Sequence, residues 1–511
     1  MAIESYWIRS TESTQYPTLS GDLEIDVAVV GGGIAGIATA WELARAGRSV
    51  AVVEADRLVA GITGHTTAKL TAQHNLIYAK LRDSFGPEAA RLYASSQQDA
   101  LAHVAAVIDE LGINCDLERR AAYTYVEESA PPSQVDQLRA EAEAAADAGL
   151  PAEFVRRTGL PFAVGGAVRV ADQAQFHPRK YLLALAADLT RRAGKIYERT
   201  RVVKLDVGSP CRLSTEHGGT ITAGQVVIAT NFPIFNRASL LARLVLRREL
   251  VLAAPIDAAA DPDGMYITTA DNTRSVRTAP FRGGRRLLIV TGETFRPGTA
   301  GVTDRFERLA GWTRQRFDVT EFAYRWAAQD VSTPDHVPFV GQFPEGKNTV
   351  YVATGFGGWG MTNAIMASRL LTALMHEGHA PAWARLYDPH RLHPLLEVPA
   401  IARAQAAVAR HFIGDRLKPS GVDRVAHLAP GSGAVLHVEG ERCAVYRDVD
   451  GTLNAVSANC THMGCVVGFN DAETSWDCPC HGSRFRVDGS ILNGPATKPL
   501  PRRDIHPKRD R

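Results

Sequence analysis

The sequence predicts an α/β protein with a Rossmann-like dinucleotide-binding domain, an inserted α+β domain and a small all-β domain at its end. Three observations lead to this prediction. Residues 25–53 read as strand, glycine-rich turn, helix and strand. Four of the seven cysteines crowd into residues 460–480. The length of 511 residues exceeds what one hydrophobic core usually supports, so more than one domain is expected.

The first element is a nucleotide-binding turn. A G-x-G-x-x-G spacing stands between an apolar run at residues 25–30 and a helix-like stretch at 34–46. The first glycine permits the turn, the second lets a pyrophosphate approach the backbone, and the third lets helix and strand pack closely. Free N–H groups at the helix start face the phosphates. The residues that we assign to the pyrophosphate are Gly31, Gly33, Ile34, Ala35 and Gly36.

Glu54 ends the second apolar run, at residues 49–53. A carboxylate there accepts hydrogen bonds from both ribose hydroxyls and repels a 2′-phosphate, so FAD or NAD fits better than NADP. The alternative is a glycine-rich turn of no consequence. The strand, the helix and Glu54 stand in register, which argues against that alternative.

The middle of the chain predicts a second layer of structure. Residues 88–148 are rich in Ala, Leu, Glu and Arg, which predicts helices broken at Pro131-Pro132, and strand-like stretches follow. We interpret this part as an inserted substrate domain of α+β type. The predicted organisation is a first domain at residues 1–395, a helical linker at 396–425 and a last domain at 426–511.

Charge and hydropathy favour neither nucleic acid nor a membrane as partner. Lys and Arg number 57 and Asp and Glu 55, a balance that offers no basic surface for nucleic acid or anionic lipid. No apolar run is long enough for a secretion signal or a membrane span. We therefore expect a cytoplasmic protein without a membrane span.

The cysteine-rich segment contains a metal-ligand pattern. Cys460-x-His462 is followed, after fifteen intervening residues, by Cys478-x-x-His481. Two thiolates on one iron and two imidazoles on the other form the ligand set of a Rieske 2Fe-2S cluster. A zinc site of two cysteines and two histidines is the alternative. Zinc, however, explains neither the additional Cys465 and Cys480 nor the following Gly-Ser.

Residues 20–390 resemble the D-amino-acid oxidase-like superfamily of FAD-dependent oxidoreductases. The likeness rests on the segments at 61–71, 226–231 and 354–362. It implies FAD as cofactor, and oxidation of amines or amino acids by hydride transfer to the flavin. It also implies further contacts to FAD: Val202 at the adenine, and Thr66, Thr67, Ala229, Thr230, Gly357, Gly358, Trp359, Gly360, Met361 and Thr362 elsewhere on the cofactor.

Residues 431–501 closely resemble the Rieske domains of the bc-type complexes. The resemblance implies that Cys460 and Cys478 bind one iron, that His462 and His481 bind the other, and that a disulfide joins Cys465 to Cys480. Aromatic-ring dioxygenases generally lack this second cysteine pair. Phe485 stands where high-potential relatives have a tyrosine, so we expect a lower reduction potential within the Rieske range.

Two residues are candidates for a role at the substrate. Asp330 stands near the position where amino-acid-oxidising relatives often have an arginine that binds the substrate carboxylate. Because two carboxylates repel each other, a cationic amine is the more attractive substrate, and the alternative is that Asp330 is a structural cap. His65 is the position at which some family branches attach FAD covalently, and the plainer alternative is a hydrogen-bonded histidine beside the flavin.

Together these features predict a dehydrogenase. An amine-type substrate reduces FAD, the Rieske cluster removes the electrons one at a time, and an external acceptor protein or quinone collects them. Two alternatives stay open. A partner reduces the cluster and the flavin then reduces a substrate or activates oxygen, or the chain is an electron-transfer module without its own substrate.

Overall fold

The chain folds into two compact units. The structure, a computed structural model, describes residues 3–235, 240, 242–270, 272–344, 346–409, 425–438 and 440–505. The large unit comprises Met1–Asn231, Glu249–Thr294 and Arg308–Leu392, and the small unit comprises Phe232–Arg248, Phe295–Glu307 and His393–Arg511. Within the described residues, no helix is long and apolar enough to cross a membrane.

The first sheet of the large unit contains the predicted nucleotide-binding strands. Among the described residues it has eight strands, and the neighbours β17, β10, β1, β2 and β7 run parallel. Residues 27–30 of β1 and all four residues of β2 are buried, as in a parallel sheet covered on both faces. The strands are β16 (Phe339–Gln342), β17 (Val350–Thr354), β10 (Thr220–Asn231), β1 (Leu23–Val30), β2 (Val50–Val53), β7 (Lys195–Tyr197), β8 (Val202–Asp206) and β9 (Cys211–Thr215).

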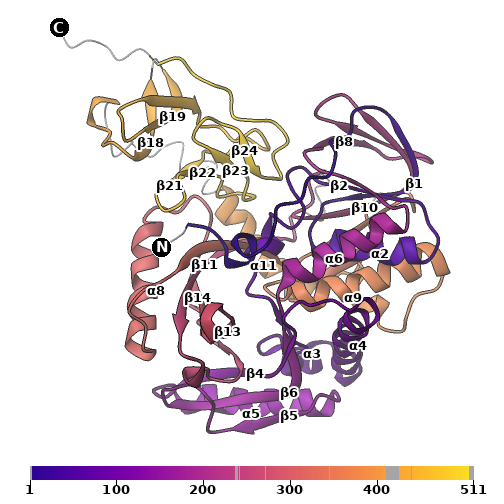
Figure 1. Ribbon diagram of the computed structural model, residues 1–511, viewed down its shortest axis with the longest axis vertical. Helices are drawn as coiled ribbons and strands as arrows, with labels where there is room; N and C mark the ends of the chain where they lie inside the picture. Colours follow the sequence, from indigo (N-terminus) through magenta and orange to yellow (C-terminus); the bar gives the residue numbers. More distant parts are fainter. Residues whose placement is uncertain are drawn as a thin grey trace. The chain divides into compact units, whose positions relative to one another are not determined.

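Helix α2 (Ile34–Arg45) follows β1 directly and packs on both β1 and β10. It also packs against α6 (Pro178–Arg191) and α9 (Gly360–Thr372), and the three helices lie together beside this sheet in Figure 1. The predicted order of strand, glycine turn, helix and strand over residues 25–53 is therefore confirmed.

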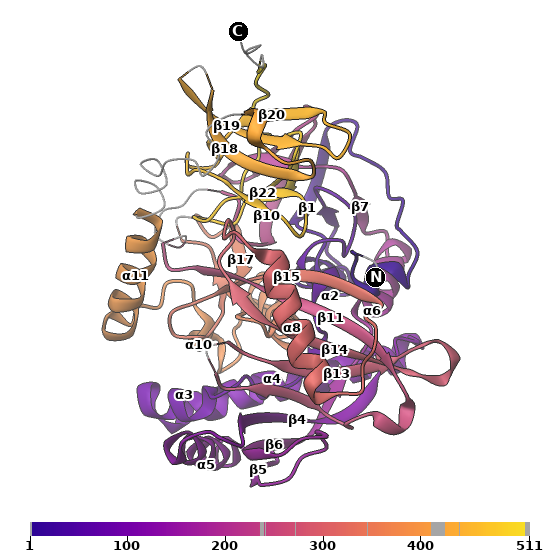
Figure 2. The same cartoon turned by 90° about the vertical axis from the view of Figure 1, so that its left-hand side faces the viewer.

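The second sheet is the inserted α+β part. Among the described residues it has nine strands in the order β15-β11-β14-β13-β12-β4-β6-β3, with β5 on β6. Helix α5 (Pro132–Asp147) packs on β5 and β6, and Figure 2 shows it there with α3 (Ile77–Phe85) and α4 (Pro87–Leu111). The strands are β3 (Lys69–Leu70), β4 (Glu118–Glu127), β5 (Ala152–Val155), β6 (Val164–Gln175), β11 (Val245–Ile256), β12 (Met265–Thr268), β13 (Ser275–Pro280), β14 (Arg286–Phe295) and β15 (Tyr324–Ser332).

Strand β4 corrects the helical prediction for residues 88–148. Helices α4 and α5 are present, but β4 lies between them and pairs with both β6 and β12. Tyr125 and Val126 of β4 are buried in the core. Pairing and burial therefore override the helix-favouring composition of this stretch.

The small unit contains two small antiparallel sheets. One has the order β18-β19-β20 and the other β21-β22-β23-β24 among the residues described. Helix α11 (Pro394–Ala409) occupies the first part of the predicted linker, whereas residues 410–424 lie outside the described residues. The strands are β18 (Ser432–Val438), β19 (Glu441–Arg447), β20 (Leu453–Ser457), β21 (Gly468–Asn470), β22 (Ser475–Asp477), β23 (Arg484–Arg486) and β24 (Ile491–Asn493).

Two segments that we assigned to the first domain belong by their contacts to the small unit, at 232–248 and 295–307. Arg248 forms an ion pair with Asp477. At the start of α8 (Val302–Arg316), the N–H groups of Val302 and Thr303 donate to the Asp471 carboxylate, at 2.8 and 3.1 Å. The small unit is therefore built from three separate stretches of the chain.

Candidate functional site

The glycine turn forms a close-packed cradle between β1 and α2. Gly31 has a φ of +114°, which favours glycine, and a Cβ there would lie 2.6 Å from the carbonyl oxygen of Ala229. A Cβ at Gly36 would lie 1.8 Å from the oxygen of Gly31. No other residue fits these two positions without moving the backbone, which is the geometry that a dinucleotide pyrophosphate requires.

The carboxylate of Glu54 is oriented by the backbone. Its two oxygens accept hydrogen bonds from the N–H groups of Gly32, at 2.7 Å, and Asp56, at 2.8 Å. Burial raises the pKa of Glu54, while these two hydrogen bonds lower it. Each oxygen keeps a lone pair for a ribose hydroxyl, so the predicted role of Glu54 is compatible with its position.

Thr63 is a residue of this site that the sequence analysis did not identify. Its hydroxyl oxygen accepts a hydrogen bond, 3.1 Å long, from the N–H of Ile34 in the first turn of α2. The N-cap residue of this helix, Gly33, has no side chain with which to cap it. The only signal in the sequence was the position of Thr63 in the segment at 61–71, because the contact joins two loops.

The loop with His65, Thr66 and Thr67 is held by three distant side chains. The Nε1–H groups of Trp326 and Trp7 donate to the carbonyl oxygens of His65, at 2.8 Å, and Thr66, at 2.6 Å. The Nδ1–H of His65 itself donates to the oxygen of Gly61, at 2.8 Å. This half-buried histidine therefore has the geometry of the plainer alternative, a hydrogen-bonded residue.

Arg277 is the third side chain. Its Nη1 donates to the carbonyl oxygens of Thr67, at 3.0 Å, and Ala68, at 2.7 Å. Burial lowers the pKa of Arg277 to about 9, so the guanidinium is still charged at neutral pH. The carbonyl oxygens of this loop are therefore bound by a buried cation.

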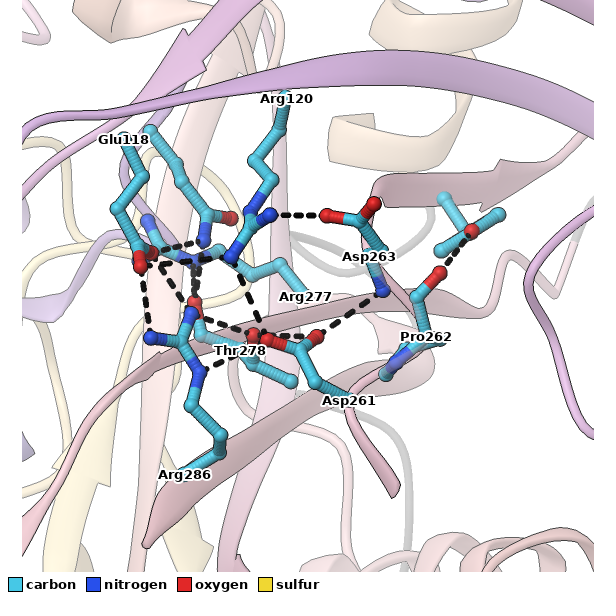
Figure 3. A network of polar contacts seen from close by, with 10 residues as sticks. Glu118, Arg120, Asp261, Pro262, Asp263, Arg277, Thr278 and Arg286 are labelled. Carbon is cyan, nitrogen blue, oxygen red and sulfur yellow. Dashed lines mark hydrogen bonds and ion pairs between the residues drawn. The ribbon is translucent and has the colours of Figure 1, made fainter. Parts of the chain in front are cut away.

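A polar network surrounds Arg277, as Figure 3 shows. Arg286 binds Glu118 through two hydrogen bonds of 2.7 Å each, and its Nη2 also donates to the Thr278 hydroxyl, at 2.9 Å. The Thr278 carbonyl accepts from Nε of Arg277, at 3.0 Å. The network joins β4, β13 and β14, so the position of Arg277 is set by the second sheet.

The glycine-rich segment at 354–362 turns into helix α9. Gly357 and Gly358 have φ values of 62° and 90°, and α9 begins at Gly360 without a side-chain cap from Trp359. The hydroxyl of Thr362 donates to the carbonyl oxygen of Thr71, at 2.8 Å. This contact joins the predicted C-terminal flavin segment to the segment at 61–71.

His74 supports this junction. Its ring stacks on Trp359, with centroids 4.9 Å apart and an interplanar angle of 19°. Its Nε2–H donates to the Thr71 oxygen, at 2.7 Å, and its Nδ1 accepts from the Tyr93 hydroxyl, at 2.5 Å. Burial lowers the pKa of His74 to about 3, so the ring is neutral and its orientation is determined by these partners.

The end of β10 lies between the other predicted flavin segments. The Ala229 carbonyl faces Gly31, and the hydroxyl of Thr354 donates to the oxygen of Asn231. Val202 is buried at the start of β8, two residues after Thr200, whose N–H donates to the backbone carbonyl oxygen of Glu54 at 2.8 Å. The structure therefore brings the predicted FAD-contacting segments together around the glycine turn between β1 and α2.

Asp330 lies half-buried on β15. The same strand supplies Trp326, which bonds the His65 carbonyl, and Ser332, which forms a bridge with Phe356. Strand β15 therefore contacts the segments at 61–71 and 354–362. This placement is consistent with a role of Asp330 at the substrate, which stays a prediction.

The four predicted iron ligands and the second cysteine pair meet in two loops of the small unit. Cys465 and Cys480 form a disulfide, as the bc-type resemblance implied. The sulfur atom of Cys478 lies within 4.8 Å of both sulfurs of this disulfide. The rings of His462 and His481 meet edge to face, with centroids 4.9 Å apart.

The donor set fits a Rieske cluster. Cys460 and Cys478 are buried thiols outside the disulfide. Nδ1 of His481 is buried and makes no hydrogen bond to any residue that the structure describes. A buried imidazole nitrogen without a hydrogen-bond partner is suited to bind a metal ion. Two thiols and two imidazoles match the ligand set of the cluster.

Comparisons with known proteins agree with this geometry. Residues 26–374 match the family model described as FAD dependent oxidoreductase, and residues 419–503 match that of the Rieske [2Fe-2S] domain. The chain is 34% identical to YhfW of Bacillus subtilis (strain 168), whose name describes it as a Rieske 2Fe-2S iron-sulfur protein, over 99% of this chain and 98% of that protein.

More distant relatives cover the first part of the chain. Gamma-glutamylputrescine oxidoreductase of Escherichia coli (strain K12) is 24% identical over 73% of this chain and 88% of its own length. The fold is similar to that of glycine oxidase from Geobacillus kaustophilus, with a TM-score of 0.59 and 22% identity over 73% of this chain and all of that chain.

Proposed function

The chain belongs to the FAD dependent oxidoreductase family and carries a Rieske [2Fe-2S] domain, and from this premise we propose that it is a dehydrogenase for amine or amino-acid-type substrates that passes electrons through the cluster to an external acceptor. The observation that carries the proposal is that one chain contains both a flavin cradle and a complete cluster-ligand set. An enzyme that handed its electrons directly to oxygen would leave the cluster without a task.

The residues assigned to each cofactor follow from the site. Bound FAD takes a hydride from the substrate, and the cluster carries single electrons. We propose that the turn at Gly31 holds the pyrophosphate, that Glu54 holds the ribose, and that the segments at 61–71, 229–231 and 354–362 surround the flavin. The cluster ligands are Cys460, His462, Cys478 and His481.

Two lines support an amine as substrate. The Escherichia coli relative is named for gamma-glutamylputrescine, an amine. Asp330 lies on β15 beside the strand's contacts to both flavin segments, where its carboxylate attracts a cationic group. We therefore propose an amine with a cationic group. Its reacting nitrogen is neutral, and the amine becomes an imine by giving up a hydride, which carries two electrons and one proton, and then losing a second proton to solvent.

Electrons then leave singly. The acceptor is a one-electron carrier protein or a quinone, and each substrate molecule requires two transfers through the cluster. The first alternative is the opposite direction of electron flow, in which a reduced partner reduces the cluster before the flavin. In the remaining alternative, the chain has no substrate of its own. A cytoplasmic location is part of the same proposal.

A substrate panel tests the substrate class. Purified holoprotein is mixed without oxygen with putrescine, spermidine, glycine or L-proline, and the loss of flavin absorbance is followed. We expect bleaching by the cationic amines, and a KM that rises for Asp330→Asn while the kcat changes less, because the lost charge acts in binding. Bleaching by amino acids alone, with an unchanged KM in the variant, would contradict the amine assignment.

A further inference from the structure

Phe232 is the residue at which the chain passes from the large unit to the small unit. It follows Asn231, the last residue of β10, and its side chain is only 3% exposed. Its ring contacts that of His481, with centroids 5.7 Å apart and an interplanar angle of 63°. A buried aromatic ring therefore touches an imidazole of the proposed cluster site.

The next residues keep this contact in place. A Cβ at Gly494 would lie 3.4 Å from Cγ2 of Ile234, so the chain after Phe232 packs on the loop that follows β24. That loop is joined to the ligand loop, since the N–H of Ala496 donates to the hydroxyl oxygen of Ser483, at 3.0 Å. The residues after Phe232 are therefore connected, through this loop, to the loop that carries His481.

On its other side, Phe232 is joined covalently to the proposed flavin contacts. Only Asn231 separates it from Thr230, so the two Cα atoms lie at most about 7 Å apart. The Ala229 carbonyl faces Gly31, and the carbonyl oxygen of Asn231 accepts a hydrogen bond from the Thr354 hydroxyl. One short stretch of chain thus connects the end of β10 with the residue whose ring contacts a proposed ligand of the cluster.

We propose that Phe232 is the bridge through which electrons pass between the flavin and the cluster, by way of His481. This inference rests on the proposed function. Imidazole ligands are neutral and thiolates are anionic, so the added electron is best accommodated on the iron that His462 and His481 bind. A bridge that ends on His481 therefore leads to the iron that accepts the electron.

Each transfer is balanced. In each transfer one electron leaves the reduced flavin and one ferric ion becomes ferrous. The hydride brings the flavin a single proton, which goes to solvent once in the course of the two transfers. The external one-electron acceptor then reoxidises the ferrous ion. Two such transfers return the flavin to its oxidised state after each substrate molecule.

The test compares Phe232→Leu, which keeps an apolar side chain but removes the ring, with Phe232→Tyr, which keeps the ring. In anaerobic single-turnover experiments, flavin bleaching by substrate should be unchanged in both variants. Cluster reduction should be slower in Phe232→Leu by about tenfold, equivalent to about 1.4 kcal/mol in activation free energy, and close to normal in Phe232→Tyr. The matched control is Phe469→Leu, whose ring contacts Tyr446 and Trp476.

Two further readouts separate a bridge from a structural support. The electron paramagnetic resonance spectrum of the dithionite-reduced cluster and its midpoint potential should be the same in Phe232→Leu and the wild type. An unchanged rate of cluster reduction in Phe232→Leu would overturn the proposal. So would a slower rate that is accompanied by an altered spectrum or potential, because the cluster itself would then have changed.

Photoreduction of the flavin distinguishes this inference from the proposed function. Light and an electron donor reduce the flavin without any substrate, so the flavin-to-cluster step is measured even if the substrate class is wrong. A wild-type cluster that is reduced after photoreduction, with equal rates in Phe232→Leu, refutes the bridge alone. A wild-type cluster that exchanges no electrons with the flavin refutes both the proposed electron path and the bridge.

Discussion

Arg248 places its Nη1 3.0 Å from Oδ2 of Asp477, the residue directly before the proposed iron ligand Cys478. Arg248 is 1% exposed, and the Asp477 side chain is fully buried. Asp477 also accepts hydrogen bonds from Arg484, at 2.9 Å, and Ser475, at 2.8 Å. This buried charge pair, with its additional hydrogen bonds, fixes the position of β22, the strand that ends directly before Cys478.

Arg248→Met should therefore destabilise the cluster site. Arg248 and Arg484 together balance the carboxylates of Asp477 and Glu473, so the loss of Arg248 leaves one carboxylate of this group uncompensated. Breaking a buried charge pair in this way costs about 3–5 kcal/mol. We expect the variant to lose iron and acid-labile sulfide while it retains FAD, measured by metal analysis and absorbance. Arg305→Met is the matched control, because both arginines lie over the ring of Phe295, at 5.7 and 5.6 Å. Equal iron content in the two variants would contradict this role.

Gly36→Ala tests the flavin cradle. The added Cβ would meet the Gly31 oxygen at 1.8 Å, so the turn must move away from the pyrophosphate position. We expect the Kd for FAD to rise at least about tenfold, equivalent to about 1.4 kcal/mol, in titrations of the flavin-free protein. Gly21→Ala is the control, since a Cβ there meets nothing within 4 Å. Unchanged FAD affinity in Gly36→Ala would argue against the cradle.

Lys69 provides a test by pH. It follows the His65 loop on β3, and its Nζ donates to the Tyr266 oxygen, at 2.9 Å, and to the Ser275 hydroxyl. Burial, reinforced by the neighbouring Arg277 cation, lowers the pKa of Lys69 to about 7. The folded state therefore binds fewer protons than the unfolded state between pH 7 and the ordinary lysine pKa of about 10.4.

The sign of the effect follows by linkage. The cost of burying the charge is fully present below pH 7 and is lost as the pH rises above 7, so wild-type stability should increase there by up to about 1.4 kcal/mol per pH unit. Lys69→Met lacks this contribution. Urea unfolding from pH 6 to 9 should show the largest advantage of the variant at low pH. A difference that does not change with pH would contradict the buried, titrating lysine.

The sequence predicted those parts of the site that lie within one short segment. The turn from Gly31 to Gly36 and the ligand pattern from Cys460 to His481 each depend on local spacing, and the structure places the ligand residues in two neighbouring loops. Strand β4 was missed because its stability comes from pairing with β6 and β12.

The remaining contacts join residues that are far apart in the sequence. Arg277 and the Thr67 loop are separated by 210 positions, and Arg248 and Asp477 by 229. No spacing rule connects such residues, since only the folded sheets bring them together. The assignment of 232–248 and 295–307 to the small unit has the same cause.

The most direct test of the electron path is an anaerobic single turnover of the holoprotein with a substrate that bleaches its flavin. Absorbance follows the flavin, and samples frozen at successive times are measured by electron paramagnetic resonance. We predict that the flavin bleaches first and that a reduced Rieske signal appears afterwards as the flavin reoxidises. A flavin that stays reduced beside an oxidised cluster, or a cluster that is reduced only by an added electron donor, would contradict the proposed path.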